Sequence, residues 1–128
     1  MKGILIIEQS ATTTRELIAA CAAAGLPVVG VASDGLEGVA MASRLQPTHV
    51  SVDLVLPRLG GLQVIQALAR HGLTPIIVVI SAVTARDSVV AARAAGARAY
   101  LLKPVVVTKL VEILVASCAA AQPCALAT

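Results

Sequence analysis

The chain has 128 residues, a length that fits one domain, since domains usually run to about 100–200 residues. Hydrophobic residues make up 58% of it and charged residues 13%, which excludes intrinsic disorder, because disordered segments are poor in hydrophobic residues and rich in charge. The basic residues behind the formal net charge of +3 are scattered, and the only aromatic residue is one tyrosine, so we expect no nucleic-acid partner, since single strands are bound on aromatic stacking platforms.

Short apolar runs alternate with longer alanine-rich stretches, a pattern that predicts strands and helices in turn. In chain order we expect a strand at 4–7, a helix at 12–24, a strand at 28–32, a helix at 35–45, a strand at 50–52, a helix at 62–70, a strand at 76–80, a helix at 85–95, a strand at 99–102 and a helix at 108–121. The strands are nearly continuous in hydrophobic residues, as is typical of strands buried on both faces. The alternation therefore predicts a three-layer, doubly wound α/β sandwich with a parallel sheet in the middle.

Glycine and proline mark the ends of the predicted helices. Gly25 and Pro27 follow the first helix, Pro47 the second, Gly72 the third and Gly96 the fourth, as expected for residues that stop helices. Five strand–helix units occupy the chain, so we expect one domain over residues 1–121, a short tail over 122–128 and no output domain.

The longest apolar stretch, residues 17–32, is broken by two glycines and a proline, whereas a membrane span needs about 20 continuous apolar residues. Residues 1–10 have too short an apolar stretch for a signal peptide. We therefore expect no membrane span and a cytoplasmic protein.

The cysteines and histidines predict no chemistry of their own. The three cysteines form no C-x-x-C pair, so we interpret them as small hydrophobic residues that stay reduced; they are Cys21, Cys118 and Cys124. His49 stands before a predicted strand and His71 at a helix end, where we expect capping or solvated side chains rather than a base or a ligand.

Polar residues follow four of the five predicted strands. Glu8 and Gln9 come after the first, Asp53 after the third, Ser81 after the fourth and Lys103 after the fifth. In a doubly wound sheet, functional groups gather outside the carboxyl ends of the strands. A carboxylate, a hydroxyl and an ammonium are also costly to bury without partners, so this edge is the candidate site.

These landmarks resemble the response regulator receiver domain of two-component signalling, in particular the single-domain chemotaxis type. The resemblance rests on ILIIEQS at 4–10, VSVDLVLPRLGGL at 50–62, VVISAVTA at 78–85 and AGARAYLLKP at 95–104, in this order. It covers nearly the whole chain and implies a flavodoxin-like (βα)5 fold with the strand order 2-1-3-4-5.

The resemblance also implies roles for particular residues. Asp53 would accept a phosphoryl group from a sensor histidine kinase, a phosphotransfer protein or a small acyl phosphate. Lys103 and Ser81 would contact the phosphoryl oxygens by charge and by hydrogen bond. Ser81, Tyr100 and Pro104, the last in a cis peptide with Lys103, would form the switch.

A magnesium ion is the implied cofactor, because Mg²⁺ prefers oxygen ligands and keeps several waters. Its ligands would be Asp53, Glu8, Gln9 and the backbone carbonyl of Val55, with Gln9 where the family usually has a directly bound acid and Glu8 where it has a water-mediated one. One unit charge at 4 Å is worth about 4 kcal/mol at an effective dielectric of 20, and most of the loss is offset by water. We expect Mg²⁺ binding at least about tenfold weaker, or lost. Glu8 could swing in to compensate, or it could pair with Lys103 and hold an empty site closed.

Other departures concern the surroundings of the site. Gly60-Gly61 stands where an Asp-Gly pair is common, and Val55 and Val83 occupy positions that resemble those setting phosphoryl lifetime. Because neither valine can orient a water, slow self-hydrolysis of a phosphorylated form is expected. The alternative is that both valines only pack against the loop.

We expect a signalling receiver rather than an enzyme, a monomer or weak homodimer that docks a downstream target through helix 85–95, strand 99–102 and helix 108–121. One alternative is a pseudo-receiver that binds its partner without phosphorylation, which Gln9 favours. Another is a small-molecule enzyme on the same fold, with the loop 10–14 cradling a phosphate. That loop has no glycine, which disfavours this alternative.

Overall fold

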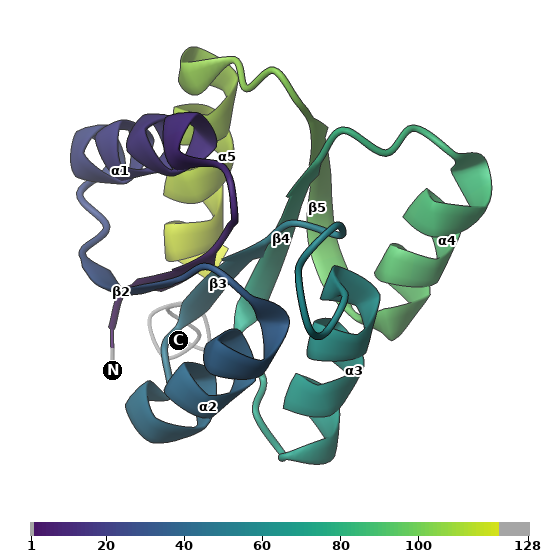
Figure 1. Ribbon diagram of the computed structural model, residues 1–128. Coiled ribbons are helices and arrows are strands. Elements are labelled where there is room, and N and C mark those ends of the chain that lie inside the picture. The colour runs from purple at the N-terminus through teal and green to yellow at the C-terminus, as the bar shows by residue number, and fades with distance from the viewer. Residues whose placement is uncertain (1, 121–128) are drawn as a thin grey trace.

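The computed structural model describes residues 2–120 of the chain. Its elements are β1 Ile4–Ile7, α1 Ala11–Ala24, β2 Val28–Ala32, α2 Gly35–Leu45, β3 His49–Val52, α3 Gly61–Arg70, β4 Ile76–Ser81, α4 Arg86–Ala95, β5 Ala97–Leu102 and α5 Val107–Ala120 (Figure 1). The predicted order of strands and helices is confirmed. The predicted tail over 122–128 and Cys124 lie outside the described residues, and the predicted domain bounds stay a prediction.

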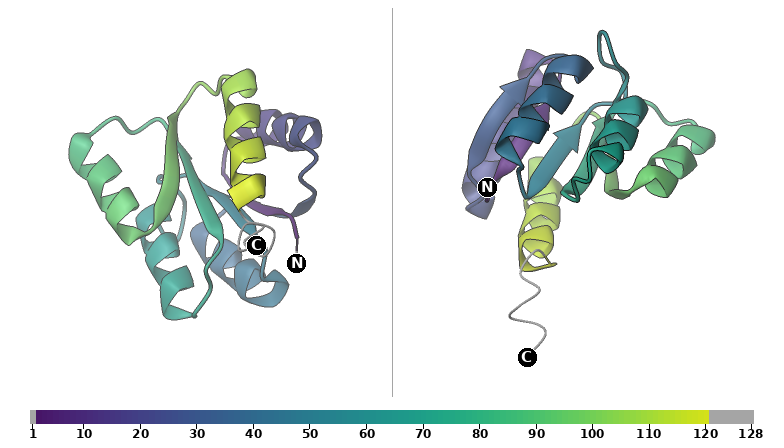
Figure 2. Two further views of the ribbon diagram at one scale, coloured as in Figure 1. Left: turned by 180° about the vertical axis from the view of Figure 1, so that it is seen from behind. Right: turned by 90° about the horizontal axis from the view of Figure 1, so that it is seen from below.

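All strands of the sheet run parallel, in the order β2-β1-β3-β4-β5. Helices α1 and α5 pack against each other on one face, and α2, α3 and α4 cover the other (Figure 2). The three-layer, doubly wound architecture and its strand order are therefore confirmed.

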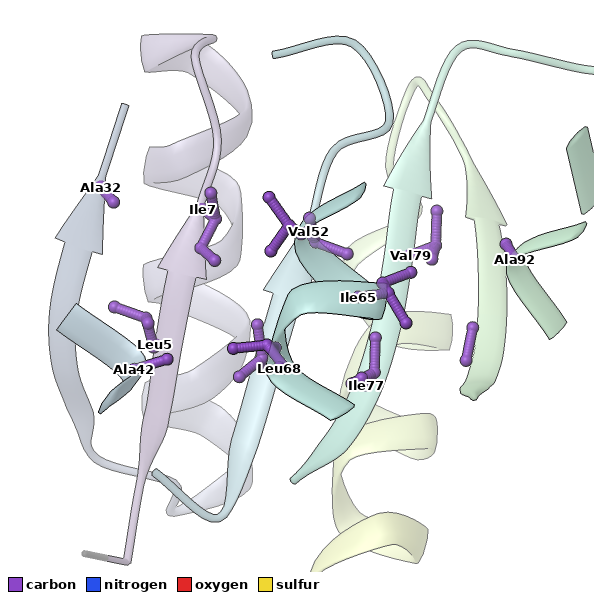
Figure 3. Packing of buried hydrophobic residues seen from close by; sticks show 13 residues of the cluster. Leu5, Ile7, Ala32, Ala42, Val52, Ile65, Leu68, Ile77, Val79 and Ala92 are labelled. Carbon is purple, nitrogen blue, oxygen red and sulfur yellow. The ribbon is translucent and has the colours of Figure 1, made fainter. Parts of the chain in front are cut away.

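The sheet separates two hydrophobic clusters because successive residues of a strand point to opposite faces. The cluster under α2, α3 and α4 includes Leu5, Ile7, Val52, Ile65 and Leu68 (Figure 3). The cluster under α1 and α5 includes Ile4, Ile6, Leu17, Leu110 and Leu114. Strands β1 and β3 are buried along their whole length.

The two edge strands differ from the prediction that every strand is buried on both faces. Most residues of β2 and β5 are only partly buried, and Val31 on β2 is 42% exposed. An edge strand has a sheet neighbour on one side only, so the helices cover it incompletely. Hydrophobic content alone therefore did not separate central from edge strands here.

Side chains at the start of α1 bond within the chain. The Ser10 hydroxyl caps the helix by accepting a hydrogen bond from the Thr13 N–H at 3.2 Å, and the Ser10 N–H donates to Glu8 Oε2 at 3.0 Å. A helix N-terminus that caps itself in this way has satisfied one of its free donors. This arrangement ties the start of α1 to Glu8, the first residue after β1.

Cys21 is a buried residue of α1 with no exposed surface. Burial, with a smaller contribution from Cys118 on α5, raises the pKa of the Cys21 thiol to about 11. The thiol therefore stays protonated at neutral pH, and the interpretation of this cysteine as a small hydrophobic residue is confirmed.

His49 is buried at 2% exposure, so the prediction of a capping or solvated side chain was wrong for this residue. Its ring Nδ1 lies 2.8 Å from the Thr48 hydroxyl. His49 is the first residue of β3 and pairs with Ile4, whose side chain belongs to the cluster under α1 and α5. His71 behaves as predicted, at the exposed C-terminal end of α3.

We predict that His49 makes the folded state less stable in acid. Burial lowers the pKa of His49 below its ordinary value of 6.5, and the nearby Ser117 backbone opposes this only in part. Below pH 6.5 the unfolded chain therefore binds a proton that the folded chain does not, so stability falls as the pH falls, by up to about 1.4 kcal/mol per pH unit. Urea unfolding between pH 7.5 and pH 5.5 measures this slope. It should shrink in His49→Gln and persist in His71→Gln; an equal slope in His49→Gln would assign it to other groups.

Candidate functional site

The backbone places the predicted site residues at one edge of the sheet. The Glu8 N–H donates to the Ala32 carbonyl at 2.9 Å, and the Asp53 N–H donates to the Ile7 carbonyl at 3.1 Å. The Lys103 N–H donates to the Ser81 backbone carbonyl at 2.9 Å. These bonds continue the parallel ladders beyond the ends of β1, β3 and β5. Residues as far apart in sequence as Glu8 and Lys103 are thereby fixed at the same edge.

Lys103 bridges the two acids of the site. Its Nζ donates to Glu8 Oε2 at 2.8 Å and to Asp53 Oδ2 at 3.0 Å. The side chains of Glu8 and Asp53 are only 1% and 4% exposed, and that of Lys103 is 19% exposed. The pairing of Glu8 with Lys103, left open by the sequence as one alternative, is present in the structure.

The pKa shifts in this triad follow from burial and from the ion pairs. Burial raises the pKa of Glu8 above its ordinary 4.5, although the hydrogen bonds from Lys103 and from the Ser10 N–H act against it. Burial alone would lower the pKa of Lys103, but its hydrogen bonds to Glu8 and Asp53 and the charges of both carboxylates outweigh this and raise it. The ammonium of Lys103 is therefore charged at neutral pH.

The backbone N–H and the backbone carbonyl of Val55 are both hydrogen-bonded to side chains of the site. Its N–H donates to Asp53 Oδ1 at 3.1 Å, and its carbonyl accepts from the Gln9 side-chain Nε2 at 2.9 Å. In this arrangement the amide N–H group of Gln9 occupies the Val55 carbonyl, and the prediction that Gln9 and this carbonyl both offer oxygens to a metal ion stays a prediction. The sequence could not show which end of the amide faces Val55.

The oxygens at this edge fit a divalent ion only in part. Asp53 offers its carboxylate, and Glu8 Oε1 is buried without a hydrogen-bond partner among residues 2–120, a position that a cation or a proton would satisfy. Gln9 and Val55, in contrast, are bonded to each other. In the described part of the chain, no three side chains of His, Cys, Asp or Glu are placed to hold a metal ion.

A second chain of hydrogen bonds leads from the end of β4 to β5. The Val83 N–H donates to the Ser81 hydroxyl at 3.1 Å, and the Tyr100 hydroxyl donates to the Val83 carbonyl at 2.7 Å. Burial raises the pKa of Tyr100, with the Ser81 hydroxyl opposing the shift. Sequence reasoning considered only the side chain of Val83 and missed its backbone, because a residue's letter does not show where its peptide groups bond.

The remaining predicted residues lie around this centre. The Lys103-Pro104 peptide is cis, as predicted. Val55 is 56% exposed and lines, with Val83, a cavity of about 230 Å³. Such exposure disagrees with the alternative that Val55 only packs against the loop.

The loop 10–14, proposed by one alternative as a phosphate cradle, is instead a capped helix start, in which the Ser10 hydroxyl and carbonyl accept bonds from Thr13 and Thr14.

Comparisons with known proteins agree on one family. The sequence family described as "Response regulator receiver domain" matches residues 4–115. The chain is 37% identical over 110 residues to the transcriptional regulatory protein PdtaR of Mycobacterium tuberculosis, a match covering 86% of this chain and 53% of PdtaR. It is 30% identical over 113 residues to the chemotaxis protein CheY of Thermotoga maritima, covering 88% of this chain and 94% of CheY.

A solved structure shows the same fold. The structure described as a CheX–CheY–BeF3–Mg complex from Borrelia burgdorferi contains a chain that superimposes with a TM-score of 0.85 at 20% identity, covering 91% of this chain and 88% of that one. This chain spans about half the length of PdtaR. No helix within residues 2–120 has the length and apolar character to cross a membrane.

Proposed function

Because the chain belongs to the response regulator receiver family, we propose that Asp53 is its phosphoacceptor. The Asp53 carboxylate attacks the phosphorus of a phosphohistidine on a sensor kinase or a phosphotransfer protein; an aspartyl phosphate forms and the histidine leaves. The observation that supports this most is the Lys103 ammonium 3.0 Å from Asp53 Oδ2. Asp53 is itself consumed in the transfer, so we propose a signalling receiver rather than an enzyme.

The residues around Asp53 supply the two things that phosphoryl transfer needs, positioning and stabilisation of charge. Asp53 Oδ1 is oriented by the Val55 N–H, and Oδ2 by Lys103. After the transfer, the Lys103 ammonium would pair with the negatively charged phosphoryl oxygens. The Ser81 hydroxyl, which accepts a hydrogen bond from the Val83 N–H, would donate its own proton to a phosphoryl oxygen.

We also propose that this chain binds Mg²⁺ more weakly than a receiver with two acids at this edge, by at least about tenfold. The ion would be held by Asp53, by Glu8 Oε1 and, after the Gln9 amide releases it, by the Val55 carbonyl. When bound, it would neutralise charge on the phosphoryl oxygens. Mg²⁺ binding would require the hydrogen bond between Gln9 and Val55 to break. A receiver with a carboxylate at position 9 has no such bond to break.

The output would be a protein contact on the face formed by α4, β5 and α5, in the cytoplasm. Leu102 and Val106 on this face are 49% and 62% exposed, and they line, with Tyr100 and Lys109, a cavity of about 310 Å³. Exposed apolar side chains beside a cavity are typical of interaction sites. The hydrogen bond between Tyr100 and Val83 connects this face to Ser81.

The test is a ¹H–¹⁵N NMR spectrum with and without beryllofluoride and millimolar Mg²⁺, since beryllofluoride mimics the phosphoryl group on an aspartate. We expect saturable shifts at Asp53, Ser81, Lys103 and Tyr100, lost in Asp53→Ala and retained in Asp87→Ala, which removes an exposed acid at the start of α4. Unchanged spectra of the wild-type chain, or shifts that survive Asp53→Ala, would contradict a phosphoacceptor role for Asp53.

One observation favours a second function, constitutive docking without phosphorylation. The bonds linking Ser81, Val83 and Tyr100 are complete while Lys103 is paired with Glu8, so the output face has one defined arrangement in this paired state. The same NMR experiment separates the two functions. Constitutive docking predicts that Tyr100, Leu102 and Val106 keep their shifts when beryllofluoride is added, whereas a phosphoryl switch predicts that they change.

A further inference from the structure

The contact between Gln9 and Val55 joins two loops that are distant in sequence. Gln9 belongs to the connection between β1 and α1, and Val55 to the connection between β3 and α3. The Gln9 amide donates to the Val55 carbonyl at 2.9 Å, while the Val55 N–H donates to Asp53 Oδ1 at 3.1 Å. The peptide groups that flank Val55 are thus fixed on one side by Gln9 and on the other by Asp53.

The chemistry of an amide explains how this contact forms without an ion. An amide nitrogen donates two hydrogen bonds, whereas an ionised carboxylate only accepts. The oxygens of a carboxylate at position 9 and the Val55 carbonyl oxygen are all negative, so they would repel each other. A cation between them would be needed to join the two loops. Gln9 joins them directly.

The charge balance of the site points the same way. Counted at their formal charges, the two carboxylates of Glu8 and Asp53 and the ammonium of Lys103, which contacts both, sum to −1. An acid at position 9 would bring the sum to −2. With Gln9 the site carries less charge for a divalent ion to neutralise.

We propose that Gln9 is a positioning residue that takes over the structural part of a divalent ion, holding Val55 and through it Asp53, so that the phosphoacceptor edge is assembled without metal. This deepens the proposed function, and its relevance to phosphoryl transfer rests on that function; the loop contact itself does not. The proposal concerns the order of the two loops and their dependence on Mg²⁺.

The test compares the wild-type chain with Gln9→Glu and Gln9→Ala by thermal unfolding and by NMR titration with Mg²⁺ alone. The wild-type unfolding midpoint should be nearly the same in EDTA and in Mg²⁺. Gln9→Glu keeps the length of the side chain and changes only its terminal group. Its unfolding midpoint should fall in EDTA and recover in Mg²⁺. Its Mg²⁺ affinity should exceed that of the wild type by at least about tenfold. Gln9→Ala should lose the hydrogen bond to the Val55 carbonyl without gaining Mg²⁺ affinity. The Val55 amide hydrogen should then exchange faster with solvent.

Gln66→Glu is the matched control, because it adds the same charge at an exposed position of α3, and it should behave as the wild type. Equal Mg²⁺ affinity in the wild type and in Gln9→Glu, or a Val55 amide unaffected by Gln9→Ala, would overturn the proposal. Since no phosphoryl donor or mimic is present, these outcomes do not depend on whether Asp53 is phosphorylated, and failure of the phosphoacceptor function would be seen only with beryllofluoride.

Discussion

Replacing Lys103 with methionine should lower the free energy of unfolding by about 3 kcal/mol at neutral pH, since removing one partner of a buried ion pair leaves the other charge uncompensated. Two carboxylates lose their cation here, Glu8 and Asp53, both nearly without exposed side-chain surface. Methionine has a similar length and flexibility, so little apolar packing is lost. Urea denaturation monitored by circular dichroism measures the change.

The controls for this prediction come from the same chain. Lys109→Met removes an exposed lysine of α5 and should change stability by less than about 0.5 kcal/mol, as surface substitutions usually do. Combining Lys103→Met with Glu8→Gln removes one of the two uncompensated charges and should recover part of the loss. A loss below about 1 kcal/mol for Lys103→Met alone, in the range of exposed ion pairs, would mean that water replaces the ammonium at little cost.

Gly61→Ala should destabilise the fold by about 2–3 kcal/mol, a typical effect of forcing extra atoms into a packed site. A Cβ atom at Gly61 would lie 2.2 Å from the Asp53 carbonyl oxygen and 2.6 Å from Leu54 Cα. Both are backbone atoms, so relief requires α3 or the connection after β3 to move. Because that connection carries Asp53, the beryllofluoride-induced shifts should weaken as well.

The neighbouring Gly60 provides the matched control. A Cβ atom there would meet Gln63 Oε1 at 2.6 Å and no backbone atom closer than 3.6 Å, and the end of a glutamine side chain can turn away. Gly60→Ala should therefore lower the unfolding free energy by less than about 1 kcal/mol and leave the beryllofluoride response intact. Alanine has a higher helix propensity than glycine, so propensity cannot cause a loss at either position. Equal losses for Gly60→Ala and Gly61→Ala would therefore contradict a specific effect of the contact with the Asp53 backbone.

The alternation of apolar runs and helical stretches predicted the three-layer sandwich with a parallel sheet, whereas the strand order 2-1-3-4-5 was implied by the family resemblance. The predicted bounds of β1, β2 and α2 agree with the structure, and the largest difference among the strands is β5, which begins at Ala97 instead of residue 99. Arg98 lies in this edge strand with its side chain exposed, so an arginine there interrupts the apolar pattern without interrupting the strand. Periodicity reports burial, and an edge strand is buried only in part.

The sequence by itself determined which residues meet at the carboxyl edge of the sheet, because the residues that directly follow parallel strands all lie at that edge. Glu8, Asp53 and Lys103 were predicted on this ground. Only the tertiary structure decided how they are connected: that Lys103 pairs with both acids, that Gln9 turns its N–H group toward Val55, and that His49 points into the core. These outcomes depend on side-chain torsions and on neighbours from other strands. Both are set by three-dimensional packing and cannot be predicted from the local sequence.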